Sequence, residues 1–278
     1  MKKSPAPTGN DWRLHIVQYE DLERTDHREL LDAMFGTRQE IASVLVLNFL
    51  PRQVCRDALG AIGTVGFEST VNPIKSDNGR PVERIGPNQS RFSADKPGYF
   101  EAQHASSPKL QAIADAMRMD IVDRLKVVMS GLFGKRLVRA REDGKNLNPY
   151  VFRHLLRAQP HVDFVPRESP DWAFAQDGIE QQIGWTSTLQ APVQGGETVI
   201  AQSSLLTEKD QRPRHPPTVT VTRQEGDLLV IPTVNLHWVN DVHGTAAPSP
   251  EGTERRINVG GFIGVRNIKK NVDWTMWG

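Results

Sequence analysis

Cysteine is almost absent from this sequence: Cys55 is the only one in 278 residues. No disulfide can therefore form within the chain, which suits a reducing compartment. The sequence also lacks a run of the roughly 20 apolar residues that a membrane-spanning helix needs. No apolar run follows the basic residues after Met1, as it would in a signal peptide. These absences predict a cytoplasmic protein that has no membrane partner.

The chain also lacks an excess of charge of either sign. Lys and Arg number 34 against 33 Asp and Glu, a formal net charge of +1. Such a balance gives no reason to expect nucleic acid or an anionic membrane as a partner. We expect a small-molecule substrate instead. The oligomeric state is unknown at this stage.

Short strands dominate the second half of the sequence. Runs rich in apolar and β-branched residues, separated by Gly and Pro turns, predict strands at Arg136–Ala140, Tyr150–Leu156, Gln181–Ala191, Thr198–Gln202, Thr218–Thr222, Asp227–Ile231 and Arg256–Val265. Strands of this number and length are typical of a sandwich or jelly roll. We therefore predict an α+β fold whose mainly β core, a jelly roll, spans residues 135–268.

The first half carries more helical patterns. Ile41 to Leu50 predicts a buried strand, and Pro51 opens a helix that runs to Ala61. A second helix, with an apolar stripe, is predicted from Ser107 and Pro108 to Gly131 or Gly134. We expect a single domain, 1–278, with an N-terminal arm and helix over 1–40 and a helical support with a substrate lid over 41–134.

The candidate site begins with His161 and Asp163, two residues apart in the extended segment from Pro160 to Phe164. Residues i and i+2 of a strand project to the same side. One imidazole nitrogen and one carboxylate oxygen can therefore meet a single metal ion. Because such a pair is common by chance, its weight depends on a third ligand further along the chain.

His237 supplies that third ligand. It follows the predicted buried strand Asp227–Ile231 and would complete a set of two imidazoles and one carboxylate. This set occupies one face of an octahedral Fe(II) and leaves the opposite face open, as in non-haem iron oxygenases. We predict that His161, Asp163 and His237 bind Fe(II) and form the catalytic centre.

A 2-oxoacid cosubstrate on the open face needs a cation for its distal carboxylate. The strand pattern after Glu254 sends Arg256, Asn258 and Gly260 to one side. A guanidinium suits this role because it is permanently charged and grips a carboxylate with two parallel hydrogen bonds. Arg256 is therefore the predicted cosubstrate anchor, and Arg255, which would face the other way, is the alternative.

Together these motifs resemble the Fe(II)/2-oxoglutarate-dependent oxygenase superfamily. The order is His161-x-Asp163, Gly195-Gly196-Glu197-Thr198, Gly226-Asp227-Leu228, His237-x-Val239-x-x-Val242 and Arg256, over roughly residues 150–265. The region from Gln89 through Tyr99 and Phe100 to His161 is similar to the bacterial branch of free-standing small-molecule hydroxylases and halogenases. The resemblance implies a double-stranded β-helix, 2-oxoglutarate and O₂ as cosubstrates, and succinate and CO₂ as products.

One departure from that branch bears on the reaction. Its halogenases carry a small residue where this chain has Asp163, and the missing carboxylate leaves a coordination position for chloride. With Asp163 present, the resemblance implies hydroxylation and disfavours halogenation.

Further residues are candidates for binding the small molecules. Arg153 is predicted to bind 2-oxoglutarate or a substrate carboxylate, with an exposed structural role as the open alternative. Placement by strand puts Trp185, Thr188 and Trp238 at the pocket. The 63–107 region, long and rich in Gly, Pro and Ser, is the expected lid, and its Arg80, Arg84 and Arg91 are candidates for recognising a carboxylate.

The sequence thus predicts a dioxygenase that hydroxylates an unactivated C–H bond of a small molecule, an amino acid or amino-acid derivative. Two alternatives stay open. The same centre could serve desaturation, epimerisation or cyclisation, or the chain could be a non-catalytic jelly-roll binding protein. Iron- and 2-oxoglutarate-dependent succinate release separates the enzyme from the binding protein.

Overall fold

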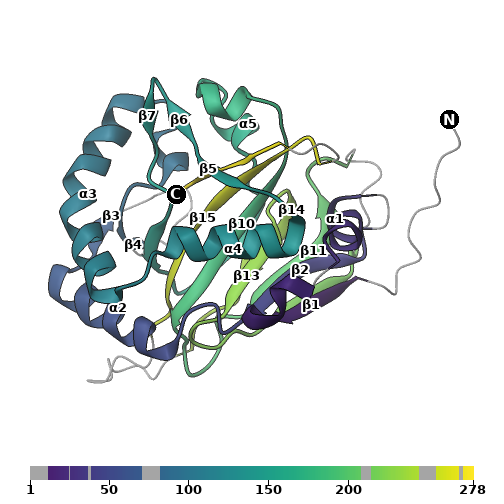
Figure 1. Ribbon diagram of the computed structural model, residues 1–278, viewed down its shortest axis with the longest axis horizontal. Helices are drawn as coiled ribbons and strands as arrows, with labels where there is room; N and C mark the ends of the chain where they lie inside the picture. The colour runs from purple at the N-terminus through teal and green to yellow at the C-terminus, as the bar shows by residue number, and fades with distance from the viewer. Residues whose placement is uncertain are drawn as a thin grey trace, which may run out of the picture.

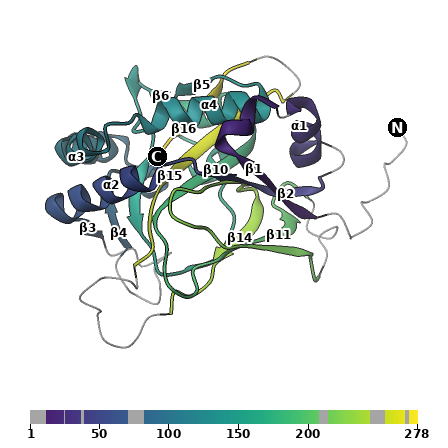
Figure 2. The same cartoon turned by 60° about the horizontal axis from the view of Figure 1, so that its bottom comes forward.

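Two β-sheets face each other, and helices cover the outer face of the larger one. A computed structural model describes residues 12–278 apart from 25, 37–38, 71–81, 208–213, 244–254 and 269–271. Figure 1 shows the helices in front of the large sheet, and Figure 2 shows the small sheet, with β11 and β14, on the opposite side of it. The space between the sheets is where the candidate site lies.

The large sheet contains ten strands. Eight form a continuous order: β1 (Arg13–Gln18), β2 (Ile41–Leu47), β13 (Leu228–Pro232), β10 (Ile179–Gln190), β15 (Ile257–Arg266), β8 (Val151–His154), β4 (Val82–Ile85) and β3 (Glu68–Thr70). The other two, β16 (Trp274–Trp277) and β5 (Leu137–Arg139), branch off β15. Strands from both halves of the sequence therefore share one sheet.

The small sheet has the order β12 (Thr218–Val221), β11 (Thr198–Ser204), β14 (Asn235–Val239) and β9 (Ala158–His161). Between β8 and β15 the chain passes back and forth between the sheets: β8, β10, β13 and β15 lie in the large one, and β9, the consecutive pair β11 and β12, and β14 lie in the small one. A separate hairpin joins β6 (Arg141–Glu142) to β7 (Lys145–Asn146).

The helices are α1 (His27–Phe35), α2 (Arg52–Val65), α3 (Lys96–Met117), α4 (Ile121–Phe133) and the short α5 (Val165–Glu168), with 3₁₀ turns η1 (Tyr19–Arg24), η2 (Gln89–Phe92) and η3 (Ala173–Gln176). Apolar residues of α1 to α4 join the sheet in one hydrophobic cluster. No helix in the described part of the chain has the length and hydropathy to cross a membrane.

Two central strands explain why the sheet is buried on both faces. In β2, Val44 and Val46 pack into the cluster under the helices, while Leu45 packs into a second cluster between the sheets. In β13, Val230 likewise packs into the cluster under the helices, and Leu229 packs into the cluster between the sheets. Successive residues of a strand face opposite sides, so a strand covered on both faces reads as a continuous apolar run.

The sequence predicted much of this correctly. All seven strands expected after Lys135 are present, as are the strand at Ile41 and the helix after Pro51, which extends to Val65. Strand β9 overlaps the extended segment predicted from Pro160 to Phe164, whereas β1, β3, β4, β6, β7, β14 and β16 were not expected. The predicted α+β fold with a core rich in β-sheet is confirmed. The finer prediction of a jelly roll stays a prediction. The single-domain boundaries stay a prediction.

The prediction of one helix beginning at Ser107 was wrong. Helix α3 already begins at Lys96, where the carboxylate of Asp95 accepts a hydrogen bond from the N–H of Gly98, and Pro108 lies inside it. The helix ends at Arg118, which has a φ of 50°. Asp120 then caps the separate helix α4. The apolar stripe thus spans two helices, and the expected loop over 63–107 contains β3, β4, η2 and the start of α3.

Candidate metal centre

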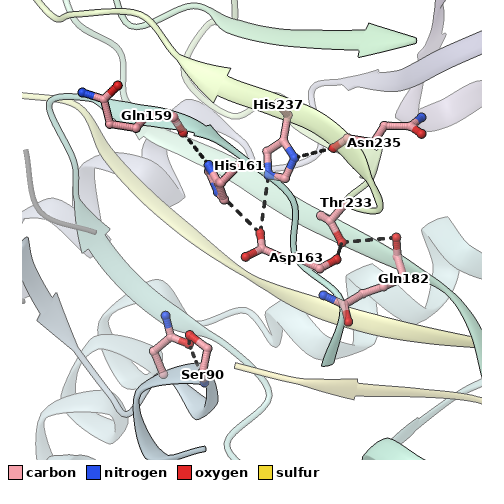
Figure 3. A network of polar contacts seen from close by, with 9 residues as sticks. Ser90, Gln159, His161, Asp163, Gln182, Thr233, Asn235 and His237 are labelled. Carbon is pink, nitrogen blue, oxygen red and sulfur yellow. Dashed lines mark hydrogen bonds and ion pairs between the residues drawn. The ribbon is translucent and has the colours of Figure 1, made fainter. Parts of the chain in front are cut away.

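His161, Asp163 and His237 meet between the two sheets. His161 ends β9 and lies directly opposite His237 in the antiparallel pairing of β9 with β14. Cross-strand neighbours on one face approach closely, and the two imidazole centroids are 4.3 Å apart. Asp163 follows β9, and its Oδ2 lies 3.5 Å from Nε2 of His161 and 3.4 Å from Nε2 of His237. Figure 3 shows both rings directed at this carboxylate.

Backbone carbonyls fix the orientation of both imidazoles. Nδ1 of His161 lies 2.6 Å from the carbonyl oxygen of Gln159, and Nδ1 of His237 lies 2.9 Å from that of Asn235. A carbonyl oxygen can only accept, so each Nδ1 carries the proton and donates it. In the neutral imidazole, Nε2 then presents its lone pair to the centre, which is the tautomer that a metal ligand needs.

The backbone of Asp163 is anchored to the large sheet through Thr233. The N–H of Asp163 donates to the carbonyl of Thr233 at 2.9 Å, and the Thr233 hydroxyl donates back to the Asp163 carbonyl at 3.0 Å. The same hydroxyl lies 3.3 Å from the carbonyl of Gln182 on β10. Thr233 is 1% exposed. Sequence reasoning missed it, although its place directly after the buried strand that leads to His237 is a usable signal.

The two histidines keep Asp163 ionised. Burial on its own raises the pKa of this carboxyl, but hydrogen bonds and charge interactions with His161 and His237 in their protonated forms outweigh that effect. The pKa is held well below its usual range. Asp163 therefore offers a carboxylate, and the two imidazoles add lone pairs once their Nε2 protons leave.

A cavity of about 130 Å³ opens beside the three residues. Its apolar wall includes Leu229, Ile231 and Val239, and its polar wall includes Thr186, Thr198 and Asn258. Three arginines also line it, Arg153, Arg223 and Arg256. The cavity thus joins the metal-ligand cluster to cationic groups that can hold anions.

Arg256 lies in that wall directly before β15 and is 4% exposed. Burial, followed by the charge of Arg223, lowers its pKa well below the usual value. Asn258 and Gly260 line the cavity with it, as the strand alternation predicted. Arg255, the alternative anchor, is exposed.

The Gly195-Gly196 turn supports Arg256 physically. Both glycines have a positive φ, 78° and 73°. A Cβ on Gly196 would lie 3.0 Å from Cδ of Arg256 and 2.9 Å from Cγ of Pro192. Only a residue without a side chain lets this turn pack so closely under the guanidinium-bearing side chain. The motif that marked the family resemblance therefore shapes the site.

Arg223 is a second cavity arginine, which sequence reasoning missed. Its guanidinium donates to the carbonyl of Thr186 at 3.1 Å and to the hydroxyl of Thr198 at 3.3 Å. Burial lowers its pKa to about 10, against the charge of Asp227, which raises it. Arg223 follows a short strand that has no distinctive spacing from His237, so nothing in the sequence pattern singled it out.

The other predicted residues are divided between the cavity and its surroundings. Arg153 lines the cavity, and Arg84 lies opposite it on β4. Arg91 lies in η2 and is partly buried. Arg80 falls outside the described residues.

The aromatic candidates have less geometric support. Trp185 borders the cavity, but it is 1% exposed and belongs to the hydrophobic cluster under the helices. Trp238 follows His237 in β14 and donates to Asn240, outside the set of residues that line the cavity. Thr188 lies on the cavity side of β10, opposite Asn258.

The three converging residues fit the ion expected from the sequence. Their ligand atoms all lie within 4.8 Å of one another, and each residue contributes one. Two imidazoles and one carboxylate are the ligand set of non-haem Fe(II) centres that keep open positions. The fixed Nδ1 hydrogen bonds supply the outer contacts that such ligands characteristically have.

Comparisons with known proteins agree with this geometry at the level of the fold. No protein-family model matches the sequence, and no curated protein matches it significantly. An N-substituted L-amino acid dioxygenase from Burkholderia ambifaria AMMD matches with a TM-score of 0.52 at 14% identity, over 90% of this chain and 89% of that one. Its complex with alpha-KG matches with a TM-score of 0.50 at 13% identity, over 90% of both chains.

The epimerase SnoN from nogalamycin biosynthesis, described as non-heme and alpha ketoglutarate dependent, matches with a TM-score of 0.49 at 14% identity, over 87% of this chain and 88% of that one. The matches to the dioxygenase, at TM-scores of 0.52 and 0.50, show a shared fold. The chain therefore has the fold of the dioxygenase, in agreement with the resemblance found in its motifs.

Proposed function

We propose that this chain is an Fe(II)- and 2-oxoglutarate-dependent oxygenase that hydroxylates a small molecule. One observation carries the proposal. Three metal-ligand atoms converge in a cavity whose wall also holds Arg256, a buried guanidinium with no hydrogen bond or ion pair to any described side chain. Strands β8 to β15 would then be the eight strands of a double-stranded β-helix, since four of them lie in each of the two facing sheets.

Each residue has a role that follows from its position. Nε2 of His161, Nε2 of His237 and the carboxylate of Asp163 hold the iron, and Arg256 binds the distal carboxylate of 2-oxoglutarate through two parallel hydrogen bonds. When bound, iron and 2-oxoglutarate together activate O₂ for attack on an unactivated C–H bond, with succinate and CO₂ as by-products. The apolar side chains of Leu229, Ile231 and Val239 keep water from the reacting atoms.

The reaction and the substrate class rest on two supports. Asp163 fills the position that a halogenase leaves for chloride, which favours hydroxylation. The dioxygenase of like fold acts, by its name, on N-substituted L-amino acids, which supports an amino-acid derivative as the substrate. No described residue favours desaturation, epimerisation or cyclisation over hydroxylation.

An anaerobic titration with Fe(II) and 2-oxoglutarate tests the proposal, read by the visible charge-transfer absorption of the chelated iron. We expect the band in the native protein. Asp163→Ala should lower iron affinity more than about 100-fold, because even outer contacts of metal ligands contribute about 10- to 100-fold. Arg256→Ala should raise the 2-oxoglutarate concentration needed by at least about tenfold, because it removes charged hydrogen bonds.

Two matched variants control the titration. Arg255→Ala removes the neighbouring, exposed guanidinium, and His104→Ala removes an exposed histidine of α3. Both should leave the band unchanged. A native protein without an iron-dependent band would refute the centre and favour the non-catalytic binding protein. If the band is present, succinate release with a panel of N-acyl amino acids identifies the substrate.

A further inference from the structure

A row of polar residues crosses four adjacent strands on the cavity face of the large sheet. Thr188 on β10 lies opposite Asn258 on β15, Asn258 lies opposite Arg153 on β8, and Arg153 lies opposite Arg84 on β4. Directly opposed residues of neighbouring strands lie on one face. The row therefore runs from the middle of the sheet, through the cavity wall at Asn258 and Arg153, toward the β3 edge.

Every member of this row has a buried polar atom that lacks a hydrogen bond to the described protein. These atoms are Oγ1 of Thr188, Oδ1 of Asn258, Nη2 of Arg153 and both Nε and Nη1 of Arg84. A buried polar group without a partner costs about 1–3 kcal/mol, and more if it is charged. Four such residues side by side need partners from outside the described protein, which ordered water or a ligand would supply.

Neither arginine forms an ion pair with an acidic side chain among the described residues. Glu68, opposite Arg84 on β3, forms its ion pair with Lys109 at 3.5 Å. Glu83 pairs with His154, on the other face of the sheet. Arg84 is 7% exposed, and burial together with the charges of Arg153 and Arg91 lowers its pKa to about 9, against the charge of Glu68, which raises it. Positive charge is therefore concentrated here and only partly compensated by Glu68 and Asp163.

The three cavity arginines and Arg84, which lies beside the cavity, thus fall into two pairs. The charge of Arg223 acts on Arg256, and the charge of Arg153 acts on Arg84. A 2-oxoglutarate molecule has a single distal carboxylate and needs only one of these pairs. Arg153 also senses the charge of Asp163, so its pair lies within electrostatic reach of the metal ligands.

We propose that Arg153 and Arg84 bind a carboxylate of the substrate, which makes the substrate a small carboxylic acid. The other pair, Arg256 and Arg223, is then left for 2-oxoglutarate. This inference rests on the proposed function and assigns Arg153 to the substrate and not to the cosubstrate. The guanidinium of Arg153 lies over the ring of Phe262, 5.9 Å from its centroid, which fixes it in the cavity wall.

Binding measurements on the iron- and 2-oxoglutarate-loaded protein test the assignment. The probes are a panel of N-acetyl-L-amino acids, each with its neutral carboxamide. We expect acids to bind and amides to bind at least about tenfold more weakly, since the charged hydrogen bonds are lost. Arg84→Met and Arg153→Met should lower the affinity for the acids by a similar factor and leave the affinity for 2-oxoglutarate unchanged. Arg256→Met should lower the affinity for 2-oxoglutarate.

The outcomes separate the two proposals. If Arg153→Met and Arg84→Met lower the affinity for 2-oxoglutarate and leave the affinity for the acids unchanged, the row of polar residues binds the cosubstrate. The inference then fails, while the proposed oxygenase function is unaffected. Acids that bind no better than their amides also overturn it. If the native protein shows no iron-dependent band, the proposed function itself fails, whatever the acids do.

Stability gives a readout that is independent of any substrate. Arg84→Met removes a buried charge without a partner and keeps most of the side-chain volume, so the melting temperature of the ligand-free protein should rise. Arg136→Met is the control, because Arg136 is 82% exposed and pairs with Asp273, and it should change little. A fall in the melting temperature of Arg84→Met would assign Arg84 to structural support and overturn the inference.

Discussion

The two faces of β15 differ in their side chains: one face packs apolar side chains under the helices, and the other contributes to the wall of the cavity. On the face under the helices, Ile257, Val259 and Ile263 are buried in one apolar cluster. On the cavity face, Asn258 and Gly260 share the wall with unpartnered polar groups. Because a strand sends alternate residues to opposite sides, a single segment contributes both to stability and to the site.

This difference teaches that stability and function are separable here residue by residue. The helix-covered face gains free energy by packing apolar volume, so its residues should be sensitive to loss of that volume. The cavity face carries polar groups whose partners are absent from the described protein, so it should tolerate the removal of those groups. The following substitutions test that contrast, in order of decreasing effect.

Ile263→Ala should be the most damaging, lowering the free energy of unfolding by about 2–5 kcal/mol, because it leaves a cavity at a site that is 0% exposed. Urea denaturation measures the change. Iron binding by the folded fraction should be retained, since Ile263 faces away from the centre. A loss of stability below about 1 kcal/mol would show that the helix-covered face is not tightly packed.

Gly196→Ala should lower the free energy of unfolding by about 1–3 kcal/mol and weaken 2-oxoglutarate, because it strains a positive φ and pushes a methyl group against Arg256. Gly144→Ala is the matched control: its φ is 75°, and a Cβ there would meet nothing within 4 Å. Comparing the two by urea denaturation and by the charge-transfer titration isolates the contact. Equal effects of both variants on 2-oxoglutarate would refute a role for the turn in placing Arg256.

Thr233→Val should cost about 1–2 kcal/mol of stability and about tenfold in iron affinity, because it removes the hydroxyl that binds the carbonyls of Asp163 and Gln182. Thermal denaturation and iron titration measure the two effects. An unchanged iron affinity would mean that the backbone hydrogen bond from Asp163 to Thr233 suffices to place the carboxylate.

Thr188→Val should have the smallest effect, within about 0.5 kcal/mol, with any change toward higher stability. The substitution matches Thr233→Val in shape and burial, but the Thr188 hydroxyl has no hydrogen-bond partner in the described chain. Thermal denaturation of both valine variants in parallel gives the comparison. A destabilisation as large as that of Thr233→Val would contradict the expectation that unpartnered polar groups of the cavity face can be removed at little cost.

The central strands could be predicted from the sequence because burial on both faces leaves an unmistakable apolar run. This holds for β2 and β13. For β9 only the extended conformation around His161 was predicted. Its pairing with β14, and β14 itself, could not be predicted, because Ala158–His161 and Asn235–Val239 contain polar residues whose strand conformation depends on pairing with distant segments. The start of α3 was hidden because Pro108 resembles a first-turn proline.

The metal ligands were accessible to sequence reasoning because their residue types and their two-residue spacing carry the chemistry. The second layer was not. Thr233 acts through its hydroxyl and its backbone, and Arg223 reaches the cavity from a strand with no distinctive motif. The opposition of Arg84 to Arg153 depends on the register of β4 with β8, which no local pattern encodes.

Strand β9 is the outermost strand of the small sheet, and only His161 and Ala158 of it are in register with β14. Pro160 removes one backbone donor from this edge, which hinders pairing with a further chain. An ion bound by both His161 and His237 would cross-link β9 to β14. Amide hydrogen exchange in β9 should then slow on iron binding. The metal would therefore stabilise the edge strand of the small sheet in addition to its role in the reaction.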